Sequence, residues 1–121
     1  MIRATIPDDM AAIASIAEAI GFQPRELEEL SAMLVTYLNG NHSSDEFWLT
    51  DDDDGEPVGV AYCAPERMTE GTWNLLFIAI RPDRQGQGRG AALIRYVEQT
   101  LMDQGARLLL VETLASFEDA R

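Results

Sequence analysis

The chain has 121 residues, of which 21 are acidic and 9 basic, and its formal net charge at pH 7 is −12. This length suits one domain around one hydrophobic core, and 46% hydrophobic residues exclude a disordered chain. The strong negative charge argues against binding to nucleic acid or to an anionic membrane surface. No apolar stretch approaches the roughly 20 residues needed to cross a bilayer.

The amino-terminal segment and the cysteine content bear on localisation and on metal binding. Residues 1–3 lack the apolar core of a secretory signal peptide, so we expect a cytoplasmic protein. Cys63 is the only cysteine, and the sequence contains no CxxC motif or Cys/His cluster. We therefore expect neither an intrachain disulfide nor a metal site.

The charge is distributed unevenly along the chain. Residues 1–70 carry 15 acidic residues and 3 arginines, whereas residues 71–121 carry 6 acidic residues and 6 arginines. The first part therefore has a charge of −12 and the second a charge of 0. An acidic surface serves solubility, and this one also suits a cationic substrate. Within the neutral part, four arginines lie close together in sequence: Arg81, Arg84, Arg89 and Arg95.

The first part of the chain predicts a strand, two helices and a hairpin. Residues 2–6 have the pattern of a short strand, and residues 7–9 begin a helix that ends at Gly21. Pro24 begins a second helix, which places several leucines on one stripe and ends at residues 39–40. Strands at 46–50 and 58–64 flank a hairpin turn at Asp54-Gly55, and we expect the acidic run 51–54 to form its solvated tip.

The second part predicts one parallel crossover. Residues 73–80 form a strongly apolar strand that we expect to be buried on both faces. After a loop, Leu93, Val97 and Leu101 mark a helix that ends at Gly105, and a strand follows at 108–111. Residues 114–121 resemble the beginning of another helix. The order β-α-α-β-β-β-α-β with a helical stub predicts a single α/β domain over residues 1–121, with a mixed sheet.

The loop between the strand at 73–80 and the following helix predicts an anion site. Gly86, Gly88 and Gly90 alternate there, and residues without a Cβ let the backbone approach a ligand. The first N–H groups of the helix lack internal partners and lie at the positive end of its dipole. Arg84 and Arg89 can pair with phosphate oxygens, so the expected ligand is a pyrophosphate.

Other interpretations of this loop differ in their fit to the sequence. A P-loop requires the lysine of GxxxxGK[ST], and the chain contains no lysine. A dinucleotide site requires GxGxxG, whereas this loop has GxGxG, although Glu112 lies about 22 residues after Gly90, where a ribose-binding acid belongs. The third alternative is a tight strand-to-helix turn that binds nothing.

Gln85-x-x-Gly88-x-Gly90 is similar to the Q/R-x-x-G-x-G/A pattern of the GNAT superfamily of N-acetyltransferases, and residues 78–93 resemble its acetyl-CoA segment almost throughout. The resemblance implies the family's acyl-CoA N-acyltransferase fold. It also implies direct acetyl transfer from acetyl-CoA to a primary amine of a small molecule or peptide. The alternative is a non-catalytic acyl-CoA-binding module.

The resemblance also implies contacts for acetyl-CoA. Amides between Gln85 and Ala91 would hold the diphosphate, and the backbone near Ile78 and Ile80, splayed from the neighbouring strand, would bind the pantetheine arm and orient the acetyl carbonyl. The implied residues are Ile78, Ala79, Ile80, Arg84, Gln85, Gly86, Gln87, Gly88, Arg89, Gly90 and Ala91.

Several side chains are candidates for the general base. Glu66 and Glu70 flank the connection before the apolar strand, and Asn74 lies early on that strand. Related enzymes often place an acid on or beside this strand, where it acts through water. His42, the only histidine, has a suitable ordinary pKa but lies in a polar loop.

The family's domain continues beyond the strand that corresponds to Leu108–Thr113. A helix follows there, which often carries a tyrosine that protonates the leaving thiolate, and two more strands come after it. This sequence has no tyrosine after Tyr96 and ends at Arg121, so we expect a fold that lacks these last strands. The apolar edge at 108–111 then predicts self-association as a homo-oligomer.

Overall fold

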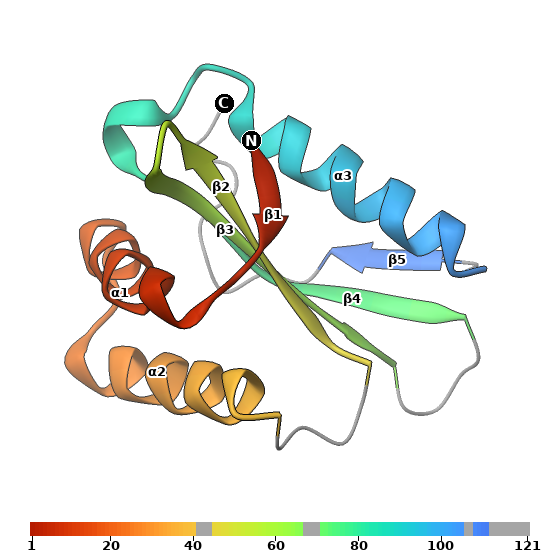
Figure 1. Cartoon of the computed structure of the whole chain (residues 1–121), viewed down its shortest axis with the longest axis horizontal. Helices are drawn as coiled ribbons and strands as arrows, with labels where there is room; N and C mark the ends of the chain where they lie inside the picture. Colours follow the sequence, from red (N-terminus) through yellow and green to blue (C-terminus); the bar gives the residue numbers. More distant parts are fainter. Residues whose placement is uncertain (41–44, 67–70, 106–107, 112–121) are drawn as a thin grey trace.

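A five-stranded sheet forms the centre of the computed structural model, with the strand order β1-β2-β3-β4-β5. The model describes residues 1–40, 45–66, 71–105 and 108–111. Helices α1 and α2 cover one face of the sheet and α3 covers the other (Figure 1). The elements are β1 (Ile2–Ala4), η1 (Pro7–Asp9), α1 (Met10–Ala19), α2 (Pro24–Leu38), β2 (Phe47–Asp53), β3 (Glu56–Pro65), β4 (Thr72–Ile80), η2 (Pro82–Arg84), α3 (Arg89–Asp103) and β5 (Leu108–Val111).

The predicted element order is confirmed. Strands β1 to β4 pair antiparallel, and β4, α3 and β5 form the parallel crossover. The expected helix at 114–121 lies outside the described residues. None of the helices in the described ranges is long and apolar enough to cross a lipid bilayer.

The hairpin between β2 and β3 differs from the expectation. Asp51, Asp52 and Asp53 belong to β2, and Asp51 is only 4% exposed. The prediction of a solvated tip is therefore wrong for these three residues, and only Asp54 and Gly55 form the turn, with φ of 58° and 89°. The strand extends because each of the three aspartates meets a basic group, and an ion pair offsets the cost of placing a carboxylate there.

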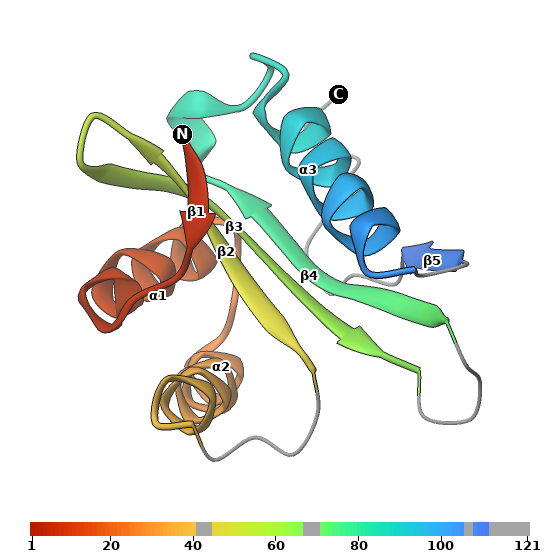
Figure 2. The same cartoon turned by 45° about the vertical axis from the view of Figure 1, so that its right-hand side comes forward.

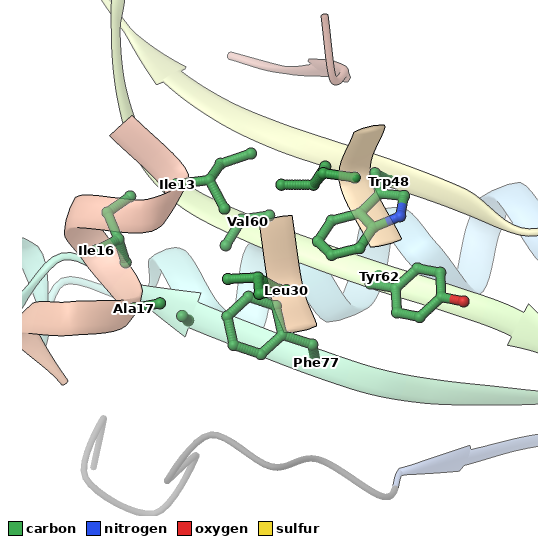
Figure 3. Close-up of a cluster of buried hydrophobic side chains, with 10 residues drawn as sticks. Ile13, Ile16, Ala17, Leu30, Trp48, Val60, Tyr62 and Phe77 are labelled. Atoms are coloured by element: carbon green, nitrogen blue, oxygen red, sulfur yellow. The ribbon is translucent and has the colours of Figure 1, made fainter. Parts of the chain in front are cut away.

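The core between the sheet and helices α1 and α2 consists of apolar side chains that recur at helical spacing in the helices and at alternate positions in the strands. Isoleucines of α1 and leucines of α2 pack against alternate residues of the central strands, where an indole and a phenol ring stack with centroids 4.4 Å apart (Figure 3). Its buried members are Ile13, Ile16, Ala17, Leu30, Leu34, Trp48, Val60, Tyr62, Phe77 and Ala79.

Helix α3 lies close to the opposite face of β3 at Gly59. Leu93, Val97 and Leu101 of α3 are buried against this face, as their spacing predicts. A Cβ on Gly59 would lie 2.8 Å from Cδ1 of Ile80 and 3.3 Å from Cδ1 of Leu93. The absence of a side chain on Gly59 therefore sets how closely the first turns of α3 approach the sheet.

We expect Gly59→Val to lower the free energy of unfolding by about 1–3 kcal/mol, because the added methyl groups overpack this contact. Denaturant titration measures the difference. Gly59→Ala adds a single methyl group and should fall between the two proteins. Equal midpoints for wild type and Gly59→Val would contradict a close approach of α3 at this position.

A buried acidic group holds the amino-terminal segment on the sheet. Asp9 is 2% exposed and accepts hydrogen bonds from Arg3 at 2.8 and 2.9 Å, from the Ile6 amide at 2.9 Å and from Thr50 Oγ1 at 3.1 Å. Burial opposes ionisation of this carboxyl, but the three donors outweigh it and lower the pKa of Asp9 below its ordinary value.

This lowered pKa predicts a contribution to stability that depends on pH. The contribution is present above the pKa of Asp9 in the unfolded chain, about 3.9, and disappears as the pH falls through the lower folded value. Melting temperatures measured from pH 6 to pH 2 should fall more steeply for the wild type than for Asp9→Asn. Parallel curves would contradict this assignment.

A β-bulge in β4 separates its two halves. Tyr62 of β3 pairs with Phe77 and Cys63 pairs with Leu75, so Leu76 is the extra residue. Strand β5 pairs with β4 only from Thr72 to Leu75. A bulge bends its strand, so β4 changes direction at Leu76, next to the last residue that pairs with β5. Among the described residues, no strand pairs with the outer edge of β4 from 76 to 80.

Candidate functional site

The glycine-rich loop leads from the open half of β4 into α3. The turn η2 begins it, and Gly86 and Gly88 follow with φ of 76° and 81°. These values lie in the left-handed region, which glycine adopts at little cost. Gly88 is the N-cap of α3. The backbone path itself therefore favours glycine at positions 86 and 88.

Six successive amides, those of residues 86–91, have no hydrogen-bond partner within the described part of the chain. The first bond of α3 runs from the Ala92 amide to the Gly88 carbonyl at 3.0 Å. Gly86, Gln87, Gly88 and Ala91 are exposed. Unpaired amides at the positive end of a 15-residue helix form an anion site.

Gln85 braces the loop against the end of β4. Its side-chain amide donates to the Ile80 carbonyl at 3.0 Å, and its main-chain amide donates to the Pro82 carbonyl at 3.4 Å. The run of amides without partners thus begins one residue later than predicted, at Gly86.

Main-chain groups of two residues point out of the open edge of β4. The Arg81 amide donates to the Val58 carbonyl at 2.8 Å, so the main-chain groups of Arg81 face β3. Main-chain groups of successive strand residues alternate in direction, so those of Ala79 also face β3, while those of Ile78 and Ile80 face the outer edge of β4, where no described strand pairs. The predicted splay of this strand from its neighbour stays a prediction.

The guanidinium groups of the loop meet carboxylates of β2. Arg84 donates to Asp53, and Arg89 lies 3.0 Å from Asp51 and 3.3 Å from Asp53. The hydrogen bond from Arg84 holds the pKa of Asp53 below its ordinary value. Figure 2 shows the β2–β3 hairpin beside η2. The predicted pairing of these arginines with phosphate stays a prediction.

Two of the predicted catalytic side chains lie together. Asn74 Nδ2 donates to Glu66 Oε2 at 3.0 Å, and the Glu66 amide donates to the Thr72 carbonyl at 2.8 Å. Asn74 is 8% exposed, and its Oδ1 has no partner among the described residues. Glu70 and His42 lie outside the described residues.

A second polar pair, which was not predicted, joins Tyr62 of β3 to Glu46. Tyr62 Oη donates to Glu46 Oε2 at 2.5 Å, and burial, followed by this carboxylate, raises the pKa of Tyr62. Figure 3 shows the Tyr62 hydroxyl and the Trp48 indole nitrogen directed towards the same end of the sheet. The sequence holds one signal for this pair, since Glu46 and Trp48 have the spacing that places them on one face of a strand.

The described residues show neither an activated thiol nor a metal centre. Burial raises the pKa of Cys63 to about 12, which keeps its thiol protonated. In the ranges that the structure describes, no three His, Cys, Asp or Glu side chains are grouped so that they could hold a metal ion.

Comparison with known proteins decides which family has this arrangement. The model of the acetyltransferase (GNAT) family matches residues 8–121. The chain belongs to this family. It is an acetyltransferase with acetyl-CoA as its cosubstrate, and it has the α/β fold of the family. A search of curated proteins gave no match.

Solved structures of the family resemble the chain closely. A GNAT acetyltransferase from Desulfovibrio desulfuricans has a TM-score of 0.84 and 28% identity, over 92% of this chain and 71% of the other. A GNAT acetyltransferase from Brucella melitensis in complex with acetyl-CoA has a TM-score of 0.73 and 26% identity, over 92% and 73%. A ribosomal-protein-alanine N-acetyltransferase from Brucella melitensis biovar Abortus has a TM-score of 0.72 and 20% identity, over 100% and 84%, which shows the fold alone.

We expect Gly88→Val to abolish binding of CoA. A β-branched residue is strained at a φ of 81° and displaces the amides beside it. Gly105→Val is the matched control, because Gly105 has a φ of 82° but lies beyond the other end of α3. Calorimetry should detect CoA binding by the control only, and undiminished binding by Gly88→Val would contradict the assignment of the loop.

Proposed function

We propose that this acetyltransferase transfers the acetyl group of acetyl-CoA directly to a primary amine of a small molecule or peptide. The observation that carries the proposal is the row of unpaired amides at 86–91, which adjoins the open edge of β4. The unpaired amides suit an anion, and the open edge of β4 suits an extended arm that contains amide groups. Coenzyme A combines a diphosphate with such an arm.

In this proposal each part of the site has a separate task. The amides of residues 86–91 hold the diphosphate. The outward main-chain groups of Ile78 bind the pantetheine arm, and its amide stabilises the oxyanion that forms on the acetyl carbonyl. The Ile80 carbonyl is already occupied by Gln85, so it supports the loop. The main-chain groups of Ala79 face Val60 of β3, and this pairing holds Ile78 and Ile80 in position.

The acceptor amine must lose a proton before it attacks, because an alkylamine is charged at neutral pH. We assign this task to Glu66, which acts through water, while Asn74 holds its carboxylate in place. The amine nitrogen then adds to the acetyl carbonyl, and the resulting oxyanion collapses as the C–S bond breaks. The thiolate leaves with the electron pair and takes up the proton that the acylated nitrogen releases. The site positions the two reactants so that this step becomes effectively unimolecular.

A cationic acceptor suits the charge of the molecule. Residues 1–70, which include Glu46 and Glu66, have a net charge of −12. The name of one structural neighbour, a ribosomal-protein-alanine N-acetyltransferase, places peptide amines among the candidates. A cytoplasmic location and self-association at the edge of β5 belong to the proposal as well.

Release of the free thiol of CoA tests the proposed transfer. The protein is incubated with acetyl-CoA and a panel of polyamines, amino acid amides and peptides, and thiol is followed with a chromogenic disulfide. The proposal requires thiol release that depends on at least one amine. Uptake of acetyl-CoA without release on any amine would contradict it and would favour the non-catalytic binding module.

The Glu66→Gln variant tests the general base. With an active amine, we expect kcat at pH 7 to fall about 100-fold, because a positioned base contributes on this scale. The KM for acetyl-CoA should stay unchanged, and the acidic limb of the pH–rate profile should disappear. Glu98→Gln, on the exposed side of α3, is the control. An unchanged profile in Glu66→Gln would remove Glu66 as the base.

A further inference from the structure

Two aspartates of β2 face the glycine-rich loop from the same side of the sheet. A strand alternates its side chains, so Asp51 and Asp53 share the face covered by α3, and Asp52 points to the other. Asp51 binds Arg89, and Asp53 binds Arg84 and lies within 3.3 Å of Arg89. Both guanidinium groups beside the diphosphate site therefore already have an anionic partner within the chain.

The two ion pairs differ in their burial. The Asp51 side chain is 5% exposed and also lies 3.5 Å from the amino-terminal ammonium group. Separating Asp51 from Arg89 would leave a buried carboxylate short of a partner, which costs several-fold more than breaking a surface pair. The side chains of Asp53 and Arg84 are 36% and 28% exposed, so water replaces a lost partner at small cost.

We propose that Asp53 competes with the diphosphate of acetyl-CoA for Arg84, while Asp51 anchors Arg89 permanently. The inference rests on the proposed function and extends it. Arg84 shares its partner Asp53 with Arg89, the first residue of α3, so its guanidinium group lies at the end of the helix where the amides are unpaired. A diphosphate offers more charge and more acceptor oxygens than one carboxylate, so Arg84 exchanges Asp53 for the ligand.

This exchange makes Asp53 a determinant of affinity. Each binding event must separate Arg84 from Asp53 and place a polyanion beside the released carboxylate. Both effects weaken the binding of acetyl-CoA. Removal of the charge on Asp53 should therefore strengthen binding, whereas loss of a residue that merely supports the fold would weaken it.

The Asp53→Asn variant tests the competition by calorimetric titration with CoA at low ionic strength. We expect a dissociation constant about three- to tenfold lower than that of the wild type. Asp54→Asn is the matched control, since it removes the same charge one residue later, at an exposed turn position with a φ of 58° that asparagine tolerates. Its dissociation constant should change by less than about twofold. Inorganic diphosphate, used as a second probe, should show the same order of affinities.

Arg84→Gln provides the second measurement. We expect weaker CoA binding, by about tenfold, and loss of the effect of Asp53→Asn when the two changes are combined. Asp53→Ser replaces Asp53→Asn if the latter does not fold. Equal tightening in Asp53→Asn and Asp54→Asn, or no tightening in the former, would overturn the competition alone. No uptake of CoA by the wild type would overturn the proposed function and this inference with it.

Discussion

The bulge at Leu76 is the feature on which the rest of the site depends. It bends β4 directly after Leu75, the last residue that pairs with the described part of β5. Among the described residues, no strand pairs with β4 beyond the bulge, so the outward main-chain groups of Ile78 are left to bind a ligand, while the Ile80 carbonyl accepts from Gln85. Because the chain then turns into α3 through a loop with unpaired amides, the open edge and the anion site adjoin each other.

The position of α3 fixes the second part of the site. Gly59 lets its first turns approach the sheet, and Leu93 packs at this contact. The ion pair between Asp51 and Arg89 then holds the first residue of the helix against β2. An acidic strand beside an anion site is unfavourable for a polyanionic ligand, but it orders the loop through which that ligand binds.

The sequence predicts the parts of this structure that depend on local patterns. The helical spacing of Leu93, Val97 and Leu101 and the alternating glycines placed the loop correctly between a buried strand and a helix. The bulge could not be predicted, because the unbroken apolar run from 75 to 80 contains no signal for strand register.

Side-chain partners that are distant in sequence explain the other differences. Aspartate disfavours strands, and β2 extends through the acidic run because basic groups meet Asp51, Asp52 and Asp53 in the folded chain. Glu66 and Asn74 were predicted as separate candidates, but their hydrogen bond depends on the pairing of β3 with β4.

The central claim is that the main-chain amides of residues 86–91 and of Ile78 bind CoA, and a measurement of individual amides tests it most directly. In a ¹⁵N–¹H NMR titration with CoA, the amide signals of residues 86–91 and of Ile78 should shift most. Signals that stay in place there while others move would contradict the account.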